Sequence, residues 1–150
     1  MKGIVSNTIG FISKTFPALY SSIYLDYLKQ YSSAYDVNKT QLRALVFVSN
    51  NGPISMTDLC AKLNIEKGSL TSMVDDLTGK GYVVREKDTA DRRKYLITIT
   101  ESGSNVAADF MGKLSISLEE KLFKLSEEEQ DKYMEAIGTL QAILNKEELS

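Results

Sequence analysis

The sequence lacks the residues on which most catalytic and metal sites depend. Its 150 residues include no histidine, no tryptophan and a single cysteine, Cys60. Without histidine or a cysteine cluster a zinc site is not expected, and the commonest general base is missing. One cysteine cannot form an internal disulfide, which suits a reducing cytoplasm. We therefore expect a cytoplasmic protein with no metal, no cofactor and no enzymatic activity.

Long apolar runs are also missing. No stretch approaches the ~20 apolar residues that a membrane span needs, so no membrane partner is expected. The N-terminal run "GIVSNTIGFIS" is interrupted by Ser, Asn, Thr and Gly, and no small-residue cleavage site follows it, which argues against a signal peptide. A chain of this length fits one domain with its own core, and we predict a single domain over residues 1–150.

Positive charge is concentrated in particular parts of the chain. The formal net charge is −2, yet residues 1–52 carry +3 and residues 101–150 carry −6. Arg92, Arg93 and Lys94 stand side by side at the tip of a predicted hairpin. Because adjacent cations repel one another, this loop suggests a polyanionic partner for one part of the chain. An ordinary solvated hairpin is the alternative on charge alone.

Two short helices around a tight turn are predicted between residues 55 and 81. Ser55 is a suitable N-cap for "MTDLCAKL", and "NIEKG" is typical of a turn. In the helix that follows, the spacing predicts a buried face formed by Leu70, Met73, Val74 and Leu77. The opposite face carries Lys67, Ser69, Thr71 and Ser72. Small polar residues in the first turns are typical of the recognition helix of a helix-turn-helix motif, although helical hairpins are common in all-α proteins.

A basic hairpin follows this motif directly. The segments "YVVREK" and "YLITIT" flank the loop "DTADRRK", and the second segment alternates apolar and polar residues along the strand. A helix-turn-helix followed by a hairpin is the order of a winged helix. The predicted fold is therefore mostly α with a small β-hairpin wing. An arm with arginine at its tip can lie along a phosphate backbone or enter a narrow minor groove.

Residues 54–103 resemble the winged-helix core of the MarR family of transcription regulators. The resemblance rests on the "DLCAKL" helix, the run "VDDLTGKGYVVRE", "DRR" in the wing, and "IT-x-x-G" at the start of the next helix. It implies a homodimer that binds a pseudo-palindromic double-stranded DNA operator and is often released by a small ligand. Two departures from the family pattern stand out: Ser72, where many members carry arginine, and Leu70, which is bulkier than usual.

The resemblance also implies which residues would contact DNA. The recognition positions are Lys67, Ser69, Thr71 and Ser72, and the wing positions are Asp91, Arg92, Arg93 and Lys94. We predict a winged helix-turn-helix core at about residues 38–100, with dimerisation helices at about 3–34 and 101–148. The predicted function is that of a dimeric repressor. The alternative is a winged-helix module for protein–protein interaction without specific DNA binding.

The segments outside the core have helix signals of their own. Asn38 with Gln41 and Ser126 with Glu129 fit capping boxes, and Pro17 should kink the first helix or begin its main part. Apolar residues recur along the last helix at Tyr133, Ile137, Leu140 and Leu144. Such a face suits packing against a second subunit, with burial inside one subunit as the alternative.

A stripe of tyrosines in the first helix suggests a small-molecule pocket. Tyr20, Tyr24 and Tyr27 follow at four- and three-residue steps, and we expect them to converge with Arg43 and Phe47 on a cleft for a small aromatic or phenolic ligand. Simple core or interface packing is the alternative. Cys60 is interpreted as a buried structural thiol rather than a redox switch. The adjacent Asp75 and Asp76 do not predict a catalytic pair, because neighbouring helical residues point about 100° apart.

Overall fold

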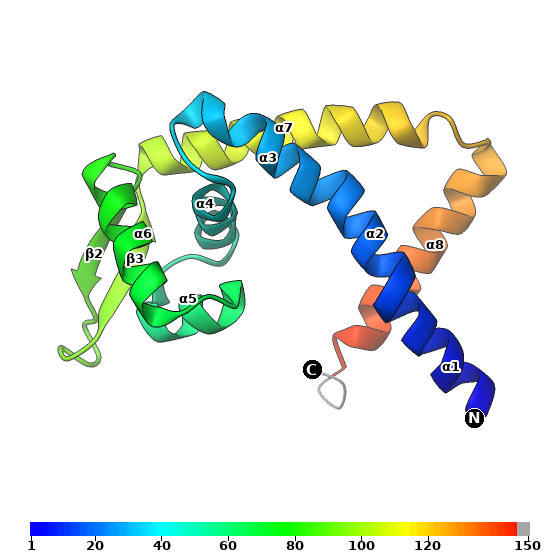
Figure 1. Ribbon diagram of the computed structural model, residues 1–150, viewed down its shortest axis with the longest axis horizontal. Helices are drawn as coiled ribbons and strands as arrows, with labels where there is room; N and C mark the ends of the chain where they lie inside the picture. Colours follow the sequence, from blue (N-terminus) through cyan, green and yellow to red (C-terminus); the bar gives the residue numbers. More distant parts are fainter. Residues whose placement is uncertain (147–150) are drawn as a thin grey trace. The chain divides into compact units, whose positions relative to one another are not determined.

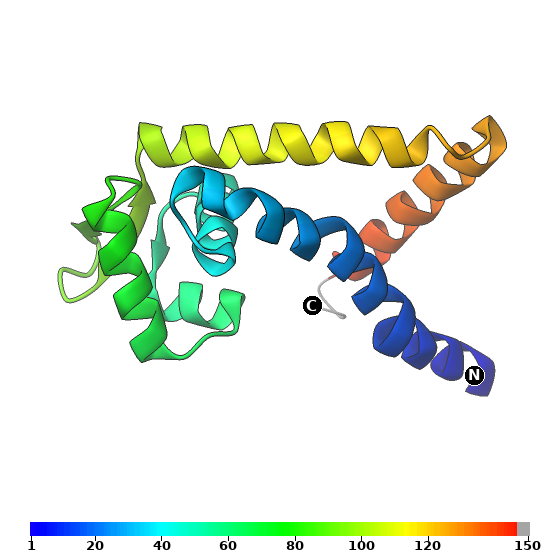
Figure 2. The ribbon, with the colours of Figure 1, turned by 45° about the horizontal axis from the view of Figure 1, so that its top comes forward.

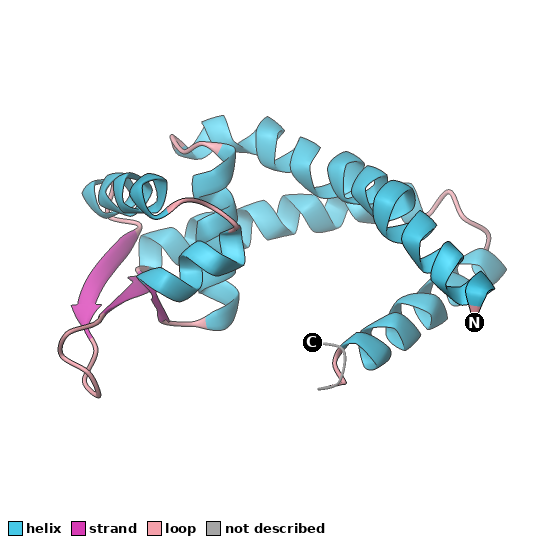
Figure 3. Ribbon diagram, turned by 60° about the horizontal axis from the view of Figure 1, so that its bottom comes forward, coloured by secondary structure: helices cyan, strands magenta, loops and turns pink. Residues whose placement is uncertain are grey.

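The computed structural model describes residues 1–146 and is built mostly from helices, with one small sheet (Figures 1 and 3). The fold class predicted from the sequence is confirmed. The helices are α1 (Lys2–Gly10), α2 (Phe16–Tyr20), α3 (Asp26–Ser32), α4 (Lys39–Asn51), α5 (Met56–Leu63), α6 (Lys67–Gly79), α7 (Glu101–Leu122) and α8 (Glu127–Leu144). The strands are β1 (Ile54–Ser55), β2 (Val83–Lys87) and β3 (Tyr95–Ile99). The described residues form two compact units, residues 1–114 and the part that begins at residue 115.

The N-terminal helices α1, α2 and α3 follow one another as one long helical run (Figure 2). Two π-helical stretches, Phe11–Thr15 and Ser21–Leu25, interrupt it. Pro17 is the second residue of α2, which begins directly after the first stretch. Proline has no N–H and its ring crowds the carbonyl four residues earlier, so a wider turn before it relieves that conflict. The irregularity predicted at Pro17 therefore takes the form of a π-helical turn.

The helix-turn-helix motif forms as predicted. Asn38 accepts hydrogen bonds from the Thr40 and Gln41 amides, and Gln41 accepts one from the Asn38 amide, so the predicted capping box of α4 is present. Ser55 Oγ accepts from the Asp58 amide at 3.1 Å at the start of α5. The turn between α5 and α6 contains Asn64 in the left-handed conformation. All four apolar residues predicted to face the core from α6 are buried.

The wing belongs to a three-stranded antiparallel sheet in the order β1-β3-β2. In the hairpin, Val83 pairs with Ile99 and Lys87 with Tyr95. The two-residue strand β1 pairs Ile54 with Ile97 and was not predicted, because two residues before a helix carry no periodicity. This strand fastens the hairpin to the segment that leads into α5.

The start of helix α7 contacts the chain just after the end of α6. Thr100 Oγ1 accepts a hydrogen bond from the Gly103 amide at 3.1 Å and donates one to the Gly81 carbonyl at 2.7 Å. Gly103 is buried, and a Cβ added there would lie 2.1 Å from the Tyr82 carbonyl oxygen. The glycine of the "IT-x-x-G" motif thus allows the helix backbone to approach the preceding chain without a side chain between them.

The turn at Tyr35 and Asp36 joins three segments. Lys80 Nζ donates to the Asp36 carbonyl at 2.5 Å, and the Tyr82 hydroxyl donates to the Tyr35 carbonyl at 3.0 Å. From α7, Asp109 accepts a hydrogen bond from the Tyr35 hydroxyl at 2.6 Å. The end of the N-terminal helical run is therefore bonded both to the end of α6 and to α7.

In the second unit, α8 begins at the predicted capping box of Ser126 and Glu129. None of its residues is buried, and its apolar face, including Ile137 and Leu140, stays open to solvent. Helix α8 ends at Leu144, and the predicted boundary at residue 148 lies outside the described residues. No helix within residues 1–146 is long and apolar enough to cross a membrane.

Candidate nucleic-acid interface

The exposed face of α6 carries the predicted recognition residues. Lys67, Ser69, Thr71 and Ser72 are all exposed, while the intervening Leu70 is fully buried. The helix is therefore anchored by its apolar side and presents hydroxyl groups and one ammonium group to solvent. The Thr71 hydroxyl donates to the Lys67 carbonyl at 3.0 Å, which leaves its oxygen free to accept a second bond.

Two adjacent carboxylates hold α6 against its neighbours. Asp75 forms an ion pair of 2.9 Å with Arg85 of β2. Asp76 accepts a hydrogen bond of 2.5 Å from Gln41 of α4 and lies 3.0 Å from Lys80. The bonds from Lys80 and then Gln41 lower the pKa of Asp76. The two carboxylates point to different partners, as their helical positions require, and together they fix α6 between α4 and the hairpin.

These anchoring partners were not singled out from the sequence. Gln41 was predicted only as a capping residue, and Arg85 was given no role. An ion pair between residues ten apart in sequence, across a turn, has no local pattern of its own.

The tip of the wing is ordered by Asp91. Its Oδ1 accepts hydrogen bonds from the backbone amide and the Nε of Arg93, at 3.1 and 3.2 Å. These bonds from Arg93 lower the pKa of Asp91. The Arg93 side chain is 92% exposed, and Arg92 and Lys94 are exposed as well. Asp91 thus orients both the backbone and the side chain of Arg93 at the tip.

Comparison with known proteins decides the family. The sequence profile of the MarR family matches residues 35–94, which span α4, the helix-turn-helix, β2 and the loop at the tip of the wing. The uncharacterised HTH-type transcriptional regulator YcgE of Bacillus subtilis is 31% identical over 108 residues, covering 72% of this chain and 70% of that protein. The chain belongs to the MarR family.

Two further proteins extend this likeness. The multiple antibiotic resistance protein MarR of Salmonella typhimurium is 28% identical over 120 residues, covering 79% of this chain and 78% of that protein. The structure of a MarR family protein from Bacillus stearothermophilus has a TM-score of 0.78 at 19% identity, covering 94% of this chain and 98% of that one, and so shares the fold. This MarR-family protein is accordingly a DNA-binding transcription regulator rather than an enzyme.

Four of the five residues predicted for a ligand pocket meet at a cleft. Tyr20, Tyr24, Arg43 and Phe47 line a cleft of about 370 Å³ together with the end of α5. Tyr27 does not line it; its ring stacks on Tyr31, with centroids 6.0 Å apart. The π-helical stretch at Ser21–Leu25 explains the difference, because its wider turn breaks the α-helical register between Tyr24 and Tyr27.

Arg43 and Lys62 are the charged residues that line this cleft. The Nη2 of Arg43 donates a hydrogen bond to the Leu63 carbonyl, and its Nε is buried without a hydrogen-bond partner among the described residues. Burial raises the pKa of the Tyr24 phenol, which Tyr20 raises further and Arg43 opposes. The Tyr24 hydroxyl is therefore protonated at neutral pH and available as a donor.

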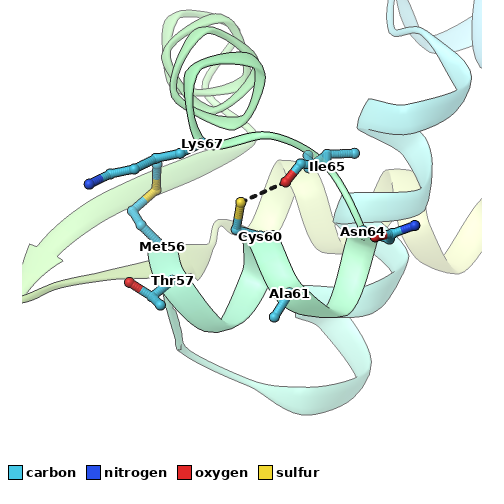
Figure 4. A pocket seen from close by; sticks show the side chains of 7 residues that line it. All are labelled: Met56, Thr57, Cys60, Ala61, Asn64, Ile65 and Lys67. Atoms are coloured by element: carbon cyan, nitrogen blue, oxygen red, sulfur yellow. Dashed lines mark hydrogen bonds between the residues drawn. The ribbon is translucent and has the colours of Figure 1, made fainter.

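Cys60 is half-buried rather than buried in the core as predicted. It follows the buried Leu59, and one step along a helix turns a side chain about 100° away from the core. Its Sγ donates to the Ile65 carbonyl at 2.7 Å and closes the turn between α5 and α6 (Figure 4). The groove beside it is about 420 Å³ and is lined by Met56, Thr57, Cys60, Ala61, Asn64, Ile65 and Lys67.

Proposed function

We propose that this protein is a cytoplasmic, dimeric repressor that reads a pseudo-palindromic DNA operator with α6 and the wing of each subunit. The observation that carries the proposal is the exposed polar face of α6, fixed beside a wing whose arginine Arg93 is held outward by Asp91. Hydroxyl groups such as those of Thr71 and Ser72 can bond base edges in the major groove. Two subunits would place two such helices about 10 bp apart.

The apolar surfaces of the terminal helices support the dimer. Ile9, Ile12 and Phe16 of the N-terminal helical run are exposed, and so is the apolar face of α8. Exposed apolar surface of this extent favours burial against another protein. The charges also suit pairing of unlike segments, because residues 1–25 contain no acidic residue, whereas the first turn of α8 holds three glutamates. In a dimer, the second copy of the chain provides an acidic α8 for the basic N-terminal run of the first copy, and a basic N-terminal run for its α8.

We expect Arg93→Ala to weaken binding to every duplex and to reduce the salt dependence of the affinity. Each lost phosphate contact lowers the slope of log K against log salt concentration by about 1. Fluorescence anisotropy of a labelled duplex at several salt concentrations measures this. Thr71→Ala is the contrasting variant, since a lost base contact changes base preference more than the slope. If the Arg93→Ala protein has wild-type affinity and salt slope, then the wing does not contact DNA. A wild type without salt-dependent duplex binding would favour the protein–protein alternative.

The cleft at Arg43 supports release by a small ligand. Arg43 lines the cleft, and a carboxylate bound there would form charge-assisted hydrogen bonds with the guanidinium. Tyr20 and Tyr24 add aromatic walls and phenolic hydroxyls. We therefore infer an aromatic carboxylate or a phenol as the ligand class. Such a ligand weakens DNA binding only if it prefers a dimer whose recognition helices are wrongly spaced.

Salicylate titrated into the preformed protein–DNA complex is expected to lower DNA affinity by about 5- to 150-fold. Linkage requires DNA to weaken salicylate binding by the same factor, which calorimetry measures. Tyr24→Phe removes one hydroxyl from the cleft and should reduce the effect, whereas Tyr31→Phe, outside the cleft, should not. Salicylate that binds the free protein and leaves DNA affinity unchanged would rule out this form of control.

A further inference from the structure

The start of α4 faces the recognition helix across a groove that the proposed function does not use. The groove is about 340 Å³. Its walls are the start of α4 on one side and the exposed edge of α6 on the other, and the lining residues are Asn38, Lys39, Thr40, Ile65, Ser69 and Met73. Ser69 belongs to the proposed DNA-reading face. Whatever contacts Ser69 from solvent therefore comes close to Lys39.

The two walls of the groove are held at a fixed separation. Gln41 is 5% exposed, and its Nε2 donates to Asp76 Oδ2 at 2.5 Å. Lys80, one residue after α6, lies 3.0 Å from the same Asp76 carboxylate and donates to the carbonyl of Asp36, two residues before the N-cap of α4. The start of α4 is thus bonded to α6 at two points, and Lys39 keeps its place when α6 docks.

The positive charge at this groove comes from the Lys39 side chain rather than from the N-terminus of α4. The side chains of Asn38 and Gln41 already satisfy the first amides of α4 through the capping box. Lys39 is exposed, and its ammonium group has no ion pair or hydrogen bond with any residue in the described part of the chain. A flexible, unpaired lysine is well suited to bind a phosphate as a point charge.

Helix α6 lies between the hairpin and α4 (Figure 1). The Asp75–Arg85 ion pair fixes the wing on one flank, and the Gln41–Asp76 hydrogen bond fixes α4 on the other. The major groove of B-DNA is about 12 Å wide and is bounded by a phosphate backbone on each side. We propose that Lys39 binds a phosphate of the DNA backbone on the side of the major groove opposite the wing. This rests on the proposed docking of α6 in that groove.

The experiment compares Lys39→Ala with Lys29→Ala on a 30-bp duplex of random sequence, because a phosphate contact does not depend on sequence. Both variants remove one exposed positive charge, but Lys29 lies in α3 and lines neither the groove nor the wing. Because the proposed dimer carries two copies of Lys39, we expect Lys39→Ala to lower the salt slope by about 1.8 and the affinity at 0.1 M salt by roughly 60-fold. Lys29→Ala should match the wild type, and Lys39→Arg should retain the wild-type slope.

The salt slopes of the wild type and the two lysine variants distinguish three cases. If the wild type binds the duplex in a salt-dependent way, and Lys39→Ala has the same affinity and salt slope as Lys29→Ala, then Lys39 does not contact a phosphate. The proposed function is unaffected by that result. Wild-type protein that does not bind the duplex at all overturns both. An equal loss of affinity in Lys39→Ala and Lys29→Ala would mean that only the net charge of the protein matters, and it would also contradict the phosphate contact. Thermal unfolding of Lys39→Ala should be unchanged, because the side chain is exposed.

Discussion

The Gly103→Ala variant is expected to unfold at a temperature about 2–12 °C below that of the wild type. The added Cβ would lie 2.1 Å from the Tyr82 carbonyl oxygen and 2.9 Å from the Ile99 side chain. A side chain could rotate away, but the Tyr82 carbonyl is backbone that also accepts from Thr100. Overpacking costs about 1–3 kcal/mol and sometimes more, and each kcal/mol shifts Tm by about 2–4 °C for 150–250 residues.

The matched control for this prediction is Gly112→Ala in the same helix. A Cβ at Gly112 would meet no atom within 4 Å, and the residue is exposed. Alanine is the better helix former by about 0.5–1 kcal/mol, so this variant should be slightly more stable than the wild type. Circular dichroism melts of the three proteins give the comparison. Equal Tm values for both alanine variants would mean that α7 does not approach Tyr82 as closely as described.

Removing residues 126–150 is expected to convert the protein to a monomer and to lower its operator affinity by at least about 100-fold. The truncation deletes α8, whose apolar face is exposed in a single chain and is proposed to pack on a second subunit. A monomer meets one half-site only, and each 1.4 kcal/mol of lost binding free energy is a tenfold loss of affinity. Sedimentation analysis and anisotropy on a two-half-site duplex measure the two effects.

A pair of substitutions on α8 separates dimerisation from loss of a whole helix. Leu140→Asp puts a charge on the apolar face, whereas Ala142→Asp puts the same charge on the opposite face, the one that carries Asp131 and Glu135. Only Leu140→Asp should weaken both the dimer and DNA binding. A truncated or Leu140→Asp monomer that keeps full operator affinity would contradict the dimeric mode of reading.

What the sequence predicted well is what depends on near neighbours in the chain. The capping boxes at Asn38 and Ser126 were predicted because each joins residues three apart, and the face of α6 followed from the helical period. Contacts across the fold were not predicted. Gln41 and Asp76 are 35 residues apart, and nothing in either local pattern indicates that they meet.

The pocket was predicted in part for the same reason. The stripe that includes Tyr20 and Tyr24 assumes a regular helix, and the assumption fails at the π-helical stretch before Tyr27. Similarly, the interpretation of Cys60 as buried relied on its neighbour Leu59, although one residue along a helix is enough to leave the core. Family resemblance gave the wing residues, whereas the role of Asp91 in holding Arg93 became clear only from the geometry.

The turn at Tyr35 and Asp36 gives the molecule a mechanical joint. The long N-terminal helical run ends in this turn, and Lys80 and Tyr82 bond the end of α6 to its two carbonyls. The helical run is therefore connected to the chain just after α6 by two hydrogen bonds, in addition to its packing in the core through Leu28. The same turn is also bonded to α7 through Asp109, so α6 and α7 are both attached to the end of the N-terminal helical run. The bonds that hold this joint come from the Lys80 ammonium and the Tyr82 hydroxyl, so Lys80→Ala together with Tyr82→Phe would release it.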